Sequence, residues 1–204
     1  MEKFILTIDG PSGVGKTSIG QQLAEFLNCN FFSSGNIYRS IAKFICDNNN
    51  KNYDHYDIEV VNNICFINGE TYNPEDLYSN KVTNMSSKIA KDENIRNYVK
   101  ESLLRYYQSL ENSLVIEGRD MGSVVFQNAK HKIYLDADLI TRGKRRENQS
   151  KMTETVSDLE KRDTEDINRS ISPLKIPEGA LVIDNTNLSL DETMKIIKES
   201  LELQ

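Results

Sequence analysis

The sequence predicts an α/β protein in which a doubly wound parallel sheet carries a small β-containing insertion and a helical lid. Short apolar runs alternate with stretches of helical periodicity along most of the chain, and this alternation is typical of βαβ units. Residues 48–81 interrupt the alternation and are rich in Asn, Tyr and Asp. Residues 142–165 are polar and highly charged, which favours a mobile surface lid over a buried segment.

Apolar runs supply the strands of the predicted sheet. Runs of this length that are almost wholly apolar are typical of parallel strands buried on both faces. The clearest are FILTI at 4–8, LVI at 114–116, KIYL at 132–135 and ALVI at 180–183, and NFFS at 30–33 is a fifth candidate.

Helical patterns and one turn signal fill the intervals between these runs. Asn68-Gly69 lies between two β-type runs and predicts a type I′ turn, so the insertion is expected to contain a hairpin. No internal repeat or low-complexity linker interrupts the rest of the sequence. Helices are expected near 16–28, 36–47, 83–111, 138–150, 154–170 and 190–203.

Composition narrows the function classes. The chain has 204 residues, of which 38% are hydrophobic, and a formal net charge of −6, which argues against a general nucleic-acid binder. No run is long enough to span a membrane, and no signal peptide is evident. The three cysteines form no C-x-x-C pair, so we expect reduced thiols and a cytoplasmic location. Low apolar surface and the negative charge favour a monomer, and neither a nucleic acid nor a membrane is expected as a partner.

The stretch GPSGVGKTS at 10–18 matches the phosphate-binding pattern G-x-x-x-x-G-K-[ST] between a strand and a helix. Its glycines let backbone N–H groups turn toward phosphate oxygens, and the helix N-terminus adds partial positive charge. Lys16 is expected to reach the β- and γ-phosphates of ATP, and Thr17 to place its hydroxyl on Mg²⁺. The predicted ATP-binding residues are Gly10, Pro11, Ser12, Gly13, Val14, Gly15, Lys16, Thr17 and Ser18.

Arginines are concentrated in a few segments of this acidic chain. Such a concentration favours a local site for small phosphates over a surface that tracks a nucleic acid. The arginines concerned are Arg39, Arg96, Arg119, Arg142, Arg145, Arg146, Arg162 and Arg169.

The segment LVIEGRD at 114–120 ends a predicted strand with charged residues, and strand ends line the ligand crevice of a doubly wound sheet. Glu117 could orient a Mg²⁺-bound water, although a carboxylate that caps a neighbouring helix is nearly as good an interpretation. Arg119 could bridge donor and acceptor phosphates; the alternative is a surface ion pair.

An acceptor that is itself a phosphate monoester would explain these features together. Its oxygens are already largely ionised at neutral pH, so no general base is needed. The difficulty is to bring two polyanions together, and guanidinium groups in a closed, dry cleft overcome it. The prediction is several arginines from different segments, no catalytic histidine and a lid.

The stretch RDTEDINR at 162–169 places Arg162, Asp166 and Arg169 on one helical face. Taken alone, a solvated ion-pair ladder is the better interpretation, because such pairs are common and weak. The phosphate-binding loop and the other arginines reverse this preference, since paired charges in a cleft favour a site.

Five segments, in order along the chain, resemble bacterial cytidylate kinase (CMP/dCMP kinase): IDGPSGVGKT, SSGNIYRS, EGRDMGSVVF, RDTEDINRSISPLK and ALVIDNTNLSLDE. The resemblance implies a P-loop nucleoside monophosphate kinase fold and transfer of the ATP γ-phosphate to CMP or dCMP with Mg²⁺. It implies a single domain with core residues 1–35, 112–140 and 172–204, an NMP-binding insertion near 36–105 and a lid near 142–165.

The same resemblance implies roles for individual residues. Ser34 and Arg39 should meet the CMP phosphate, and lid residues Arg142, Arg145 and Arg146 are candidates for closing over the transferred group. The cytosine should be contacted by Ser87, Arg96 and Asp120. The pentose should be contacted by Arg162 and Asp166, and the phosphates by Arg169. The implied catalytic residues are Lys16, Arg119, Arg142 and Arg169.

Two other classes of function remain open from the sequence. One is a kinase for another acceptor, such as UMP, AMP, dTMP or a hydroxylated metabolite, although a hydroxyl acceptor would call for a catalytic base that the sequence does not offer. The other is a nucleotide-binding regulatory or assembly module that retains the loop without phosphoryl transfer.

Overall fold

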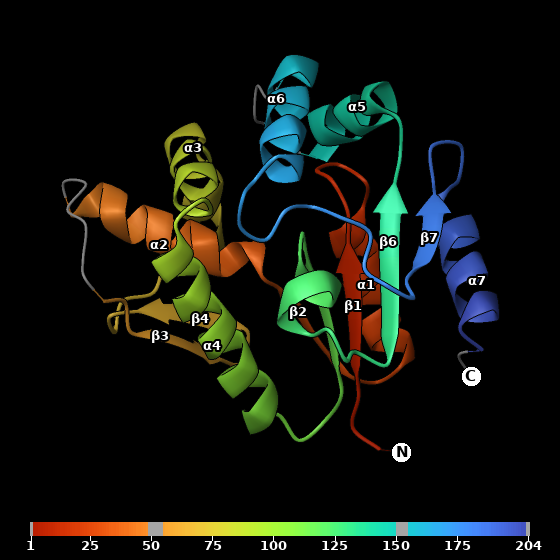
Figure 1. Ribbon diagram of the computed structural model, residues 1–204, viewed down its shortest axis with the longest axis horizontal. Coiled ribbons are helices and arrows are strands. Elements are labelled where there is room, and N and C mark those ends of the chain that lie inside the picture. Colours follow the sequence, from red (N-terminus) through yellow and green to blue (C-terminus); the bar gives the residue numbers. More distant parts are fainter. Residues whose placement is uncertain (1, 49–54, 150–154, 203–204) are drawn as a thin grey trace. The chain divides into compact units, whose positions relative to one another are not determined.

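The computed structural model describes residues 2–48, 55–149 and 155–202 (Figure 1). The chain divides into two compact units, the first formed by residues 1–32 and 111–204 and the second by residues 33–110. The predicted insertion at 36–105 lies inside the second unit, and the predicted lid belongs to the first.

A five-stranded sheet forms the centre of the first unit in the order β2-β5-β1-β6-β7. β1 pairs in parallel with β5 and with β6, and β6 pairs in parallel with β7. All five apolar runs are therefore confirmed as strands. Their bounds are Ile5–Asp9 for β1, Asn30–Ser33 for β2, Leu114–Gly118 for β5, His131–Asp136 for β6 and Leu181–Asp184 for β7.

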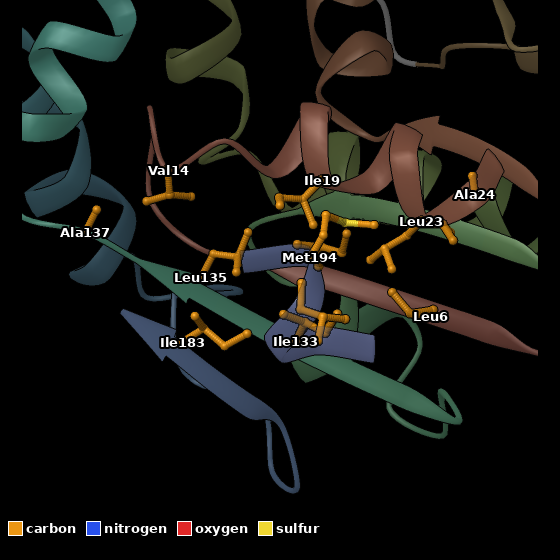
Figure 2. Packing of buried hydrophobic residues seen from close by; sticks show 13 residues of the cluster. Leu6, Val14, Ile19, Leu23, Ala24, Ile133, Leu135, Ala137, Ile183 and Met194 are labelled. Atoms are coloured by element: carbon orange, nitrogen blue, oxygen red, sulfur yellow. The ribbon is translucent and has the colours of Figure 1, made fainter. Parts of the chain in front are cut away.

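Side chains along β1 alternate between the two faces of the sheet. Leu6 and Ile8 are fully buried in a cluster that includes Ile19 and Leu23 of the following helix, as Figure 2 shows for Leu6, Ile19 and Leu23. Burying each such side chain contributes about 1.5–3 kcal/mol. Because side chains alternate along a strand, Thr7 and Asp9 face the other side.

The helices of the first unit follow the strands in sequence. They are α1 (Lys16–Phe26), α5 (Leu139–Gln149), α6 (Val156–Ile167) and α7 (Leu190–Ser200), together with the π-helical turn η2 (Met121–Val125). α6 and α7 each begin with a capping box, at Thr155 and Ser189, which satisfies backbone N–H groups that have no partner within the helix. The predicted helix ends at 150, 154 and 203 fall outside the described residues.

The second unit combines helices with a two-stranded antiparallel sheet. Its elements are α2 (Gly35–Asp47), β3 (Ile58–Val61), β4 (Ile64–Ile67), the 3₁₀ turn η1 (Pro74–Tyr78), α3 (Asn80–Ile89) and α4 (Glu93–Ser109).

The predicted turn at Asn68-Gly69 is confirmed, but it is not the turn that joins the two strands. Asn68 and Gly69 both have positive φ, and the N–H of Glu70 donates to the carbonyl of Ile67 at 3.0 Å. β3 and β4 are instead joined by Asn62-Asn63, whose φ angles of 49° and 65° suit a two-residue hairpin loop.

The single helix predicted over 83–111 is wrong. The structure has two helices, because the chain leaves α3 after Ile89 and restarts after Asp92, whose carboxylate accepts from the N–H of Ile95 at 3.1 Å. An aspartate at this position starts a new helix by satisfying its first N–H groups.

Candidate active site

The phosphate-binding loop connects β1 to α1 in the first unit, as predicted. At Gly10, φ is 148° and an added Cβ would come within 2.1 Å of the carbonyl oxygen of Leu135, so only glycine fits where the loop leaves the sheet. Lys16 begins α1, and its Nζ donates to the carbonyls of Gly10 at 2.8 Å and Pro11 at 2.6 Å. The ammonium group thus lies across its own loop.

Burial, reinforced by the nearby charge of Arg119, lowers the pKa of Lys16 to about 7. The acids Glu117 and Asp9 act in the opposite direction, but less strongly than burial. An anion beside Lys16 would favour its charged form and raise this pKa.

Oxygen atoms suited to a divalent cation meet where α1 begins and β5 ends. The hydroxyl of Thr17 donates to Oε1 of Glu117 at 2.7 Å, and Glu117 is 6% exposed. Hard cations such as Mg²⁺ take oxygen ligands and usually retain water and substrate phosphates as further ligands. Within residues 2–48, 55–149 and 155–202, no group of three or more His, Cys, Asp or Glu residues is placed to hold a metal ion.

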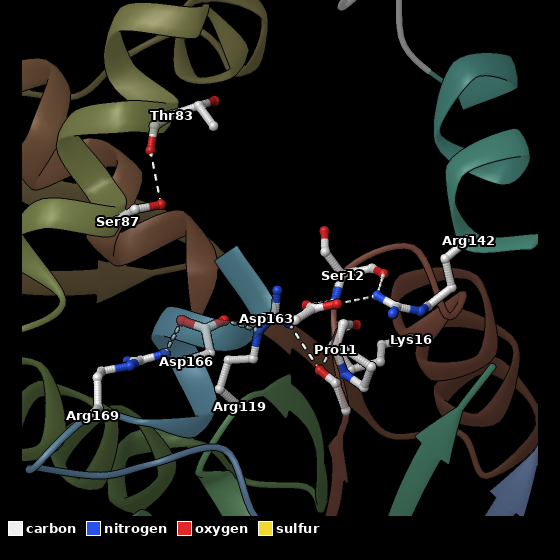
Figure 3. A network of polar contacts seen from close by, with 11 residues as sticks. Pro11, Ser12, Lys16, Thr83, Ser87, Arg119, Arg142, Asp163, Asp166 and Arg169 are labelled. Atoms are coloured by element: carbon white, nitrogen blue, oxygen red, sulfur yellow. Dashed lines mark hydrogen bonds and ion pairs between the residues drawn. The ribbon is translucent and has the colours of Figure 1, made fainter. Parts of the chain in front are cut away.

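Arg142, Asp163 and the backbone of Ser12 form the inner cluster (Figure 3). Arg142 of α5 makes an ion pair with Asp163 of α6 and donates to the carbonyl of Ser12 at 3.1 Å. Oδ1 of Asp163 accepts from the N–H of Ser12 at 3.5 Å. Arg142 also donates to Ala137 at 2.9 Å, so both charges are buried and bonded.

Arg119, Asp166, Arg169 and the backbone of Gly10 form the outer cluster. Arg119 donates from Nε to Asp166 at 2.8 Å and from Nη1 to the carbonyl of Gly10 at 3.0 Å. Arg169 pairs with the other oxygen of Asp166, and Figure 3 shows the carboxylate between the two guanidinium groups. Burial alone would raise the pKa of Asp166, but the two arginines outweigh it and hold this pKa below its usual range.

A pocket of about 250 Å³ opens beside the phosphate-binding loop, between the start of α1 and the segment that joins β7 to α7. Asn185 supports its wall by donating to the carbonyl of Val14 at 2.9 Å, while its own Oδ1 accepts from Arg145 at 2.8 Å. Arg145 donates further to the backbone carbonyls of Asn185 and Leu188. The side chain of Arg145 is therefore held in place at this pocket.

Four predicted acceptor residues lie in the second unit. Arg39 donates to the hydroxyl of Thr83 at 2.8 Å and to the carbonyl of Leu77 at 3.2 Å, and Ser87 donates to the carbonyl of Thr83 at 3.3 Å. Thr83 thus links Arg39 to Ser87. The other two are Ser34, which precedes α2, and Arg96, whose Nε donates to the carbonyl of Ala90 at 2.7 Å.

Within the first unit, the structure brings Lys16, Arg119 and Arg142 to the carbonyls of the phosphate-binding loop. Asp166 and Arg169 join this group through Arg119. Arg146 is half-buried on α5, and its role in the site stays a prediction. Asp120 is buried after the end of β5, and Arg162 is half-buried on α6, close enough to help lower the pKa of Asp166. Sequence reasoning missed Asp163 and Asn185, although both stand inside the motifs RDTEDINR and ALVIDNTNLSLDE. Their positions were the available signal, because Asn185 directly follows a strand and Asp163 lies on the face of α6 that meets the phosphate-binding loop.

The chain matches the family model described as cytidylate kinase over residues 6–203. It is 35% identical to the cytidylate kinase of Mycoplasma genitalium, with 93% of each chain covered. It is 36% identical to the cytidylate kinase of Ureaplasma urealyticum serovar 10, with 98% of this chain and 96% of that protein covered.

Solved structures with far lower identity share the fold. The shikimate kinase of Bacteroides thetaiotaomicron aligns with a TM-score of 0.51 and 14% identity over 98% of this chain and 99% of that chain. A gluconokinase of Sinorhizobium meliloti 1021 aligns with a TM-score of 0.53 and 12% identity over 98% and 94%. At 12–14% identity these likenesses concern the α/β architecture alone, whereas the family model and the 35–36% identity to the two cytidylate kinases match the sequence itself. The chain therefore belongs to the cytidylate kinase family.

Proposed function

We propose that the protein is a nucleoside monophosphate kinase that transfers the γ-phosphate of ATP to CMP or dCMP, giving ADP and CDP or dCDP. The observation that carries this proposal is the outer cluster, where Arg119 joins the carbonyl of Gly10 in the phosphate-binding loop to Asp166 on α6. Two guanidinium groups share one carboxylate there, so the cluster retains a net positive charge beside the donor loop.

The chemistry needs positioning and charge compensation more than proton transfer. An oxygen of the CMP phosphate attacks the γ-phosphorus, and the bond from phosphorus to the β–γ bridging oxygen breaks as ADP leaves. Lys16, Arg119, Arg142 and Arg169 would stabilise the negative charge on the transferred group. The acceptor is already ionised at neutral pH, so the absence of a catalytic base from the proposed site is no obstacle.

The donor nucleotide would bind along the loop that precedes α1. Its phosphates would accept from backbone N–H groups of residues 12–18, with Lys16 leaving the loop carbonyls to reach them. The pocket lined by Val14, Arg145 and Asn185 includes part of that loop in its wall and would receive the nucleoside part. Arg145, held by Asn185, presents a planar cation to such a group.

Thr17 and Glu117 fit a Mg²⁺ ion that accompanies the donor. The hydroxyl of Thr17 would be a direct ligand and the carboxylate of Glu117 would orient a bound water. Such an ion supplies charge compensation between the β- and γ-phosphates. Chelation of Mg²⁺ is expected to abolish transfer.

We propose the same roles in acceptor binding that the resemblance to cytidylate kinases implies for individual residues. Ser34 and Arg39 would bind its phosphate, Arg162 and Asp166 its pentose, and Ser87, Arg96 and Asp120 its cytosine. A carboxylate such as Asp120 accepts well from the exocyclic amine of cytosine but would face a carbonyl oxygen of uracil. Recognition of this kind can discriminate by up to about 10⁴–10⁵-fold, because the wrong base leaves buried polar groups unpaired.

A coupled ADP-release assay across CMP, dCMP, UMP, AMP and dTMP tests the proposal. We expect turnover with CMP and dCMP well above UMP, and loss of that preference in Asp120→Ala. ATP turnover that does not depend on any nucleoside monophosphate would favour a regulatory module instead. A preference for another monophosphate would retain the kinase and reject the acceptor, and full CMP selectivity in Asp120→Ala would reject the role of Asp120.

A further inference from the structure

Asp9, the last residue of β1, makes contacts that the proposed reaction does not use. Its side chain is fully buried, and it accepts from the N–H of Met121 at 2.8 Å and from the N–H of Gly122 at 2.7 Å. The two oxygens of one carboxylate therefore hold two successive backbone groups of η2. These hydrogen bonds connect residues that are 112 and 113 positions apart in the chain.

The contact between β1 and η2 is too close for a side chain at residue 122. A Cβ added to Gly122 would lie 2.6 Å from Oγ1 of Thr7 and 3.2 Å from Oδ2 of Asp9. The turn thus rests directly on the face of β1 that carries Thr7 and Asp9. The hydroxyl of Thr7 is buried there and has no hydrogen-bond partner, so Asp9 is the residue of this pair that binds the turn.

The position of η2 fixes the residues that precede it. Arg119 and Asp120 stand immediately before Met121, and Asp120 accepts at its backbone carbonyl from Val124 at 2.9 Å. On the other side of Asp9, Gly10 receives the hydrogen bond from Arg119. Asp9 and its chain neighbour thus contact both ends of the Arg119–Gly122 segment.

Burial raises the pKa of the Asp9 carboxyl to about 6, and the two N–H groups of η2 limit the rise. The group is therefore ionised at neutral pH, when charge-assisted hydrogen bonds to backbone N–H groups are stronger than neutral ones. The charge of Asp120 raises this pKa, and the charge of Lys16 lowers it.

We infer that Asp9 is a positioning residue, whose carboxylate clamps the N–H groups of Met121 and Gly122 and so orients Arg119 and Asp120 for the acceptor nucleotide. This inference depends on the proposed function for the identity of the acceptor. The clamp itself is a property of the nucleotide-free protein and can be measured there.

The first experiment measures amide hydrogen exchange of the segment 119–125 without nucleotide. Asp9→Asn keeps the shape of the side chain but turns one amide N–H₂ toward a backbone N–H. We expect exchange at Met121 and Gly122 to accelerate by about tenfold or more, the size expected when charge-assisted hydrogen bonds are lost from a buried site. Thr7→Val is the matched control, because it alters the same face of β1 at an unbonded hydroxyl, and it is expected to leave exchange unchanged.

The second experiment separates acceptor from donor. In Asp9→Asn, KM for CMP should rise and kcat should fall by about tenfold or more, whereas the dissociation constant of a non-hydrolysable ATP analogue should stay within about threefold. Calorimetry suits the analogue, since the sequence contains no tryptophan to report binding. If Asp9 had a purely structural role, its substitution would weaken the binding of both nucleotides together, and this result would overturn the inference.

A third variant tests the clamp without touching its charge. Gly122→Ala forces the turn away from Thr7, and Thr7→Ala in the same chain removes the closest obstructing atom. We expect Gly122→Ala to raise KM for CMP and the double variant to recover part of that loss. Unchanged exchange at Met121 and Gly122 in Asp9→Asn, or unchanged KM in Gly122→Ala, would overturn the inference. If the wild-type protein showed no turnover that depends on CMP, the proposed function would be rejected instead. The hydrogen-exchange result would still decide whether the clamp exists.

Discussion

The inner and outer clusters use the same chemistry on one helix with different outcomes. Asp163 and Asp166 are three residues apart on α6 and each pairs with an arginine that also donates to a carbonyl of the phosphate-binding loop. In the inner cluster one arginine meets one aspartate, with side-chain exposures of 9% and 11%. In the outer cluster two arginines share Asp166, which is 21% exposed.

The two clusters differ in the ratio of arginines to aspartates and in exposure to solvent, and we expect different roles for them. A buried one-to-one pair is electrically neutral and gives α5, α6 and the loop a fixed arrangement, since neither charge can be released without loss of its partner. A cluster with two cations, one anion and access to solvent can exchange the carboxylate for a phosphate. We therefore expect the stability of the fold to depend more on the inner cluster, although its Arg142 is also a proposed catalytic residue, and phosphate chemistry to depend more on the outer cluster.

The largest expected effect comes from breaking the inner cluster on one side. Asp163→Ala leaves the Arg142 guanidinium buried without its anion, and we expect the free energy of unfolding to fall by about 3–5 kcal/mol. Denaturant unfolding measures this loss. Glu160→Ala, at an exposed position of the same helix, is the matched control and should change the value by less than about 0.5 kcal/mol.

Removal of both inner charges sharpens the same test. Asp163→Leu combined with Arg142→Met replaces the pair with apolar groups of similar length, and much of the stability should return. Transfer activity need not return, because Arg142 is also a proposed catalytic residue. A loss below about 1 kcal/mol in the single variant Asp163→Ala would show that the pair is solvated and would remove the contrast between the clusters.

Breaking the outer cluster should change catalysis more than stability. Arg119→Ala removes the guanidinium group that joins the loop to Asp166, and we expect kcat to fall by about 10²–10³-fold. Asp166 retains Arg169, so the fold should persist, and the dissociation constant of ATP should change by less than about tenfold. Steady-state kinetics and calorimetry check the two values.

Arg105→Ala serves as the control for that experiment, because Arg105 also donates to a backbone carbonyl, that of Ile58 at 3.1 Å, but belongs to no proposed site. Its kcat should remain close to that of the wild type. Equal losses of transfer and ATP binding in Arg119→Ala would mean that this arginine stabilises the loop instead.

The smallest expected effect is the pH dependence of Asp166. Because the pKa of Asp166 is held below the ordinary value of 3.8, ionised Asp166 stabilises the folded state at neutral pH, and this stabilisation is lost as pH falls through the lowered pKa. Asp166→Asn should cost on the order of 1 kcal/mol at neutral pH, reduced by partial exposure. The difference in unfolding free energy between the two proteins should shrink below pH 3.8; a constant difference would contradict the assignment.

Features set by neighbouring residues were predictable from the sequence. The phosphate-binding loop depends on the local spacing of Gly10, Gly15 and Lys16, and the strands depend on short apolar runs, so both were predicted correctly. The break between α3 and α4 was missed because helical periodicity continues across Asp92, whose capping bond to Ile95 interrupts it. The hairpin loop at Asn62-Asn63 was missed because the stronger signal at Asn68-Gly69 lies only a few residues further on.

Contacts between distant segments could not be predicted from residue patterns. The bonds of Asp163 to Ser12, Asn185 to Val14 and Asp9 to Met121 span 151, 171 and 112 positions. Which polar residue meets which loop depends on strand order, because β5 and β6 flank β1 although they are far from it in sequence. The composition of a segment does not indicate the order of strands in the sheet.

The carbonyl oxygen of Gly10 receives both the ammonium of Lys16 and the guanidinium of Arg119. Burial is the main cause of the lowered pKa of Lys16, and the repulsion between these two like charges lowers it further. An anion that draws either cation away relieves this repulsion for the one left behind. The polyphosphate of the proposed donor would place negative charge beside both cations and so weaken the repulsion between Lys16 and Arg119.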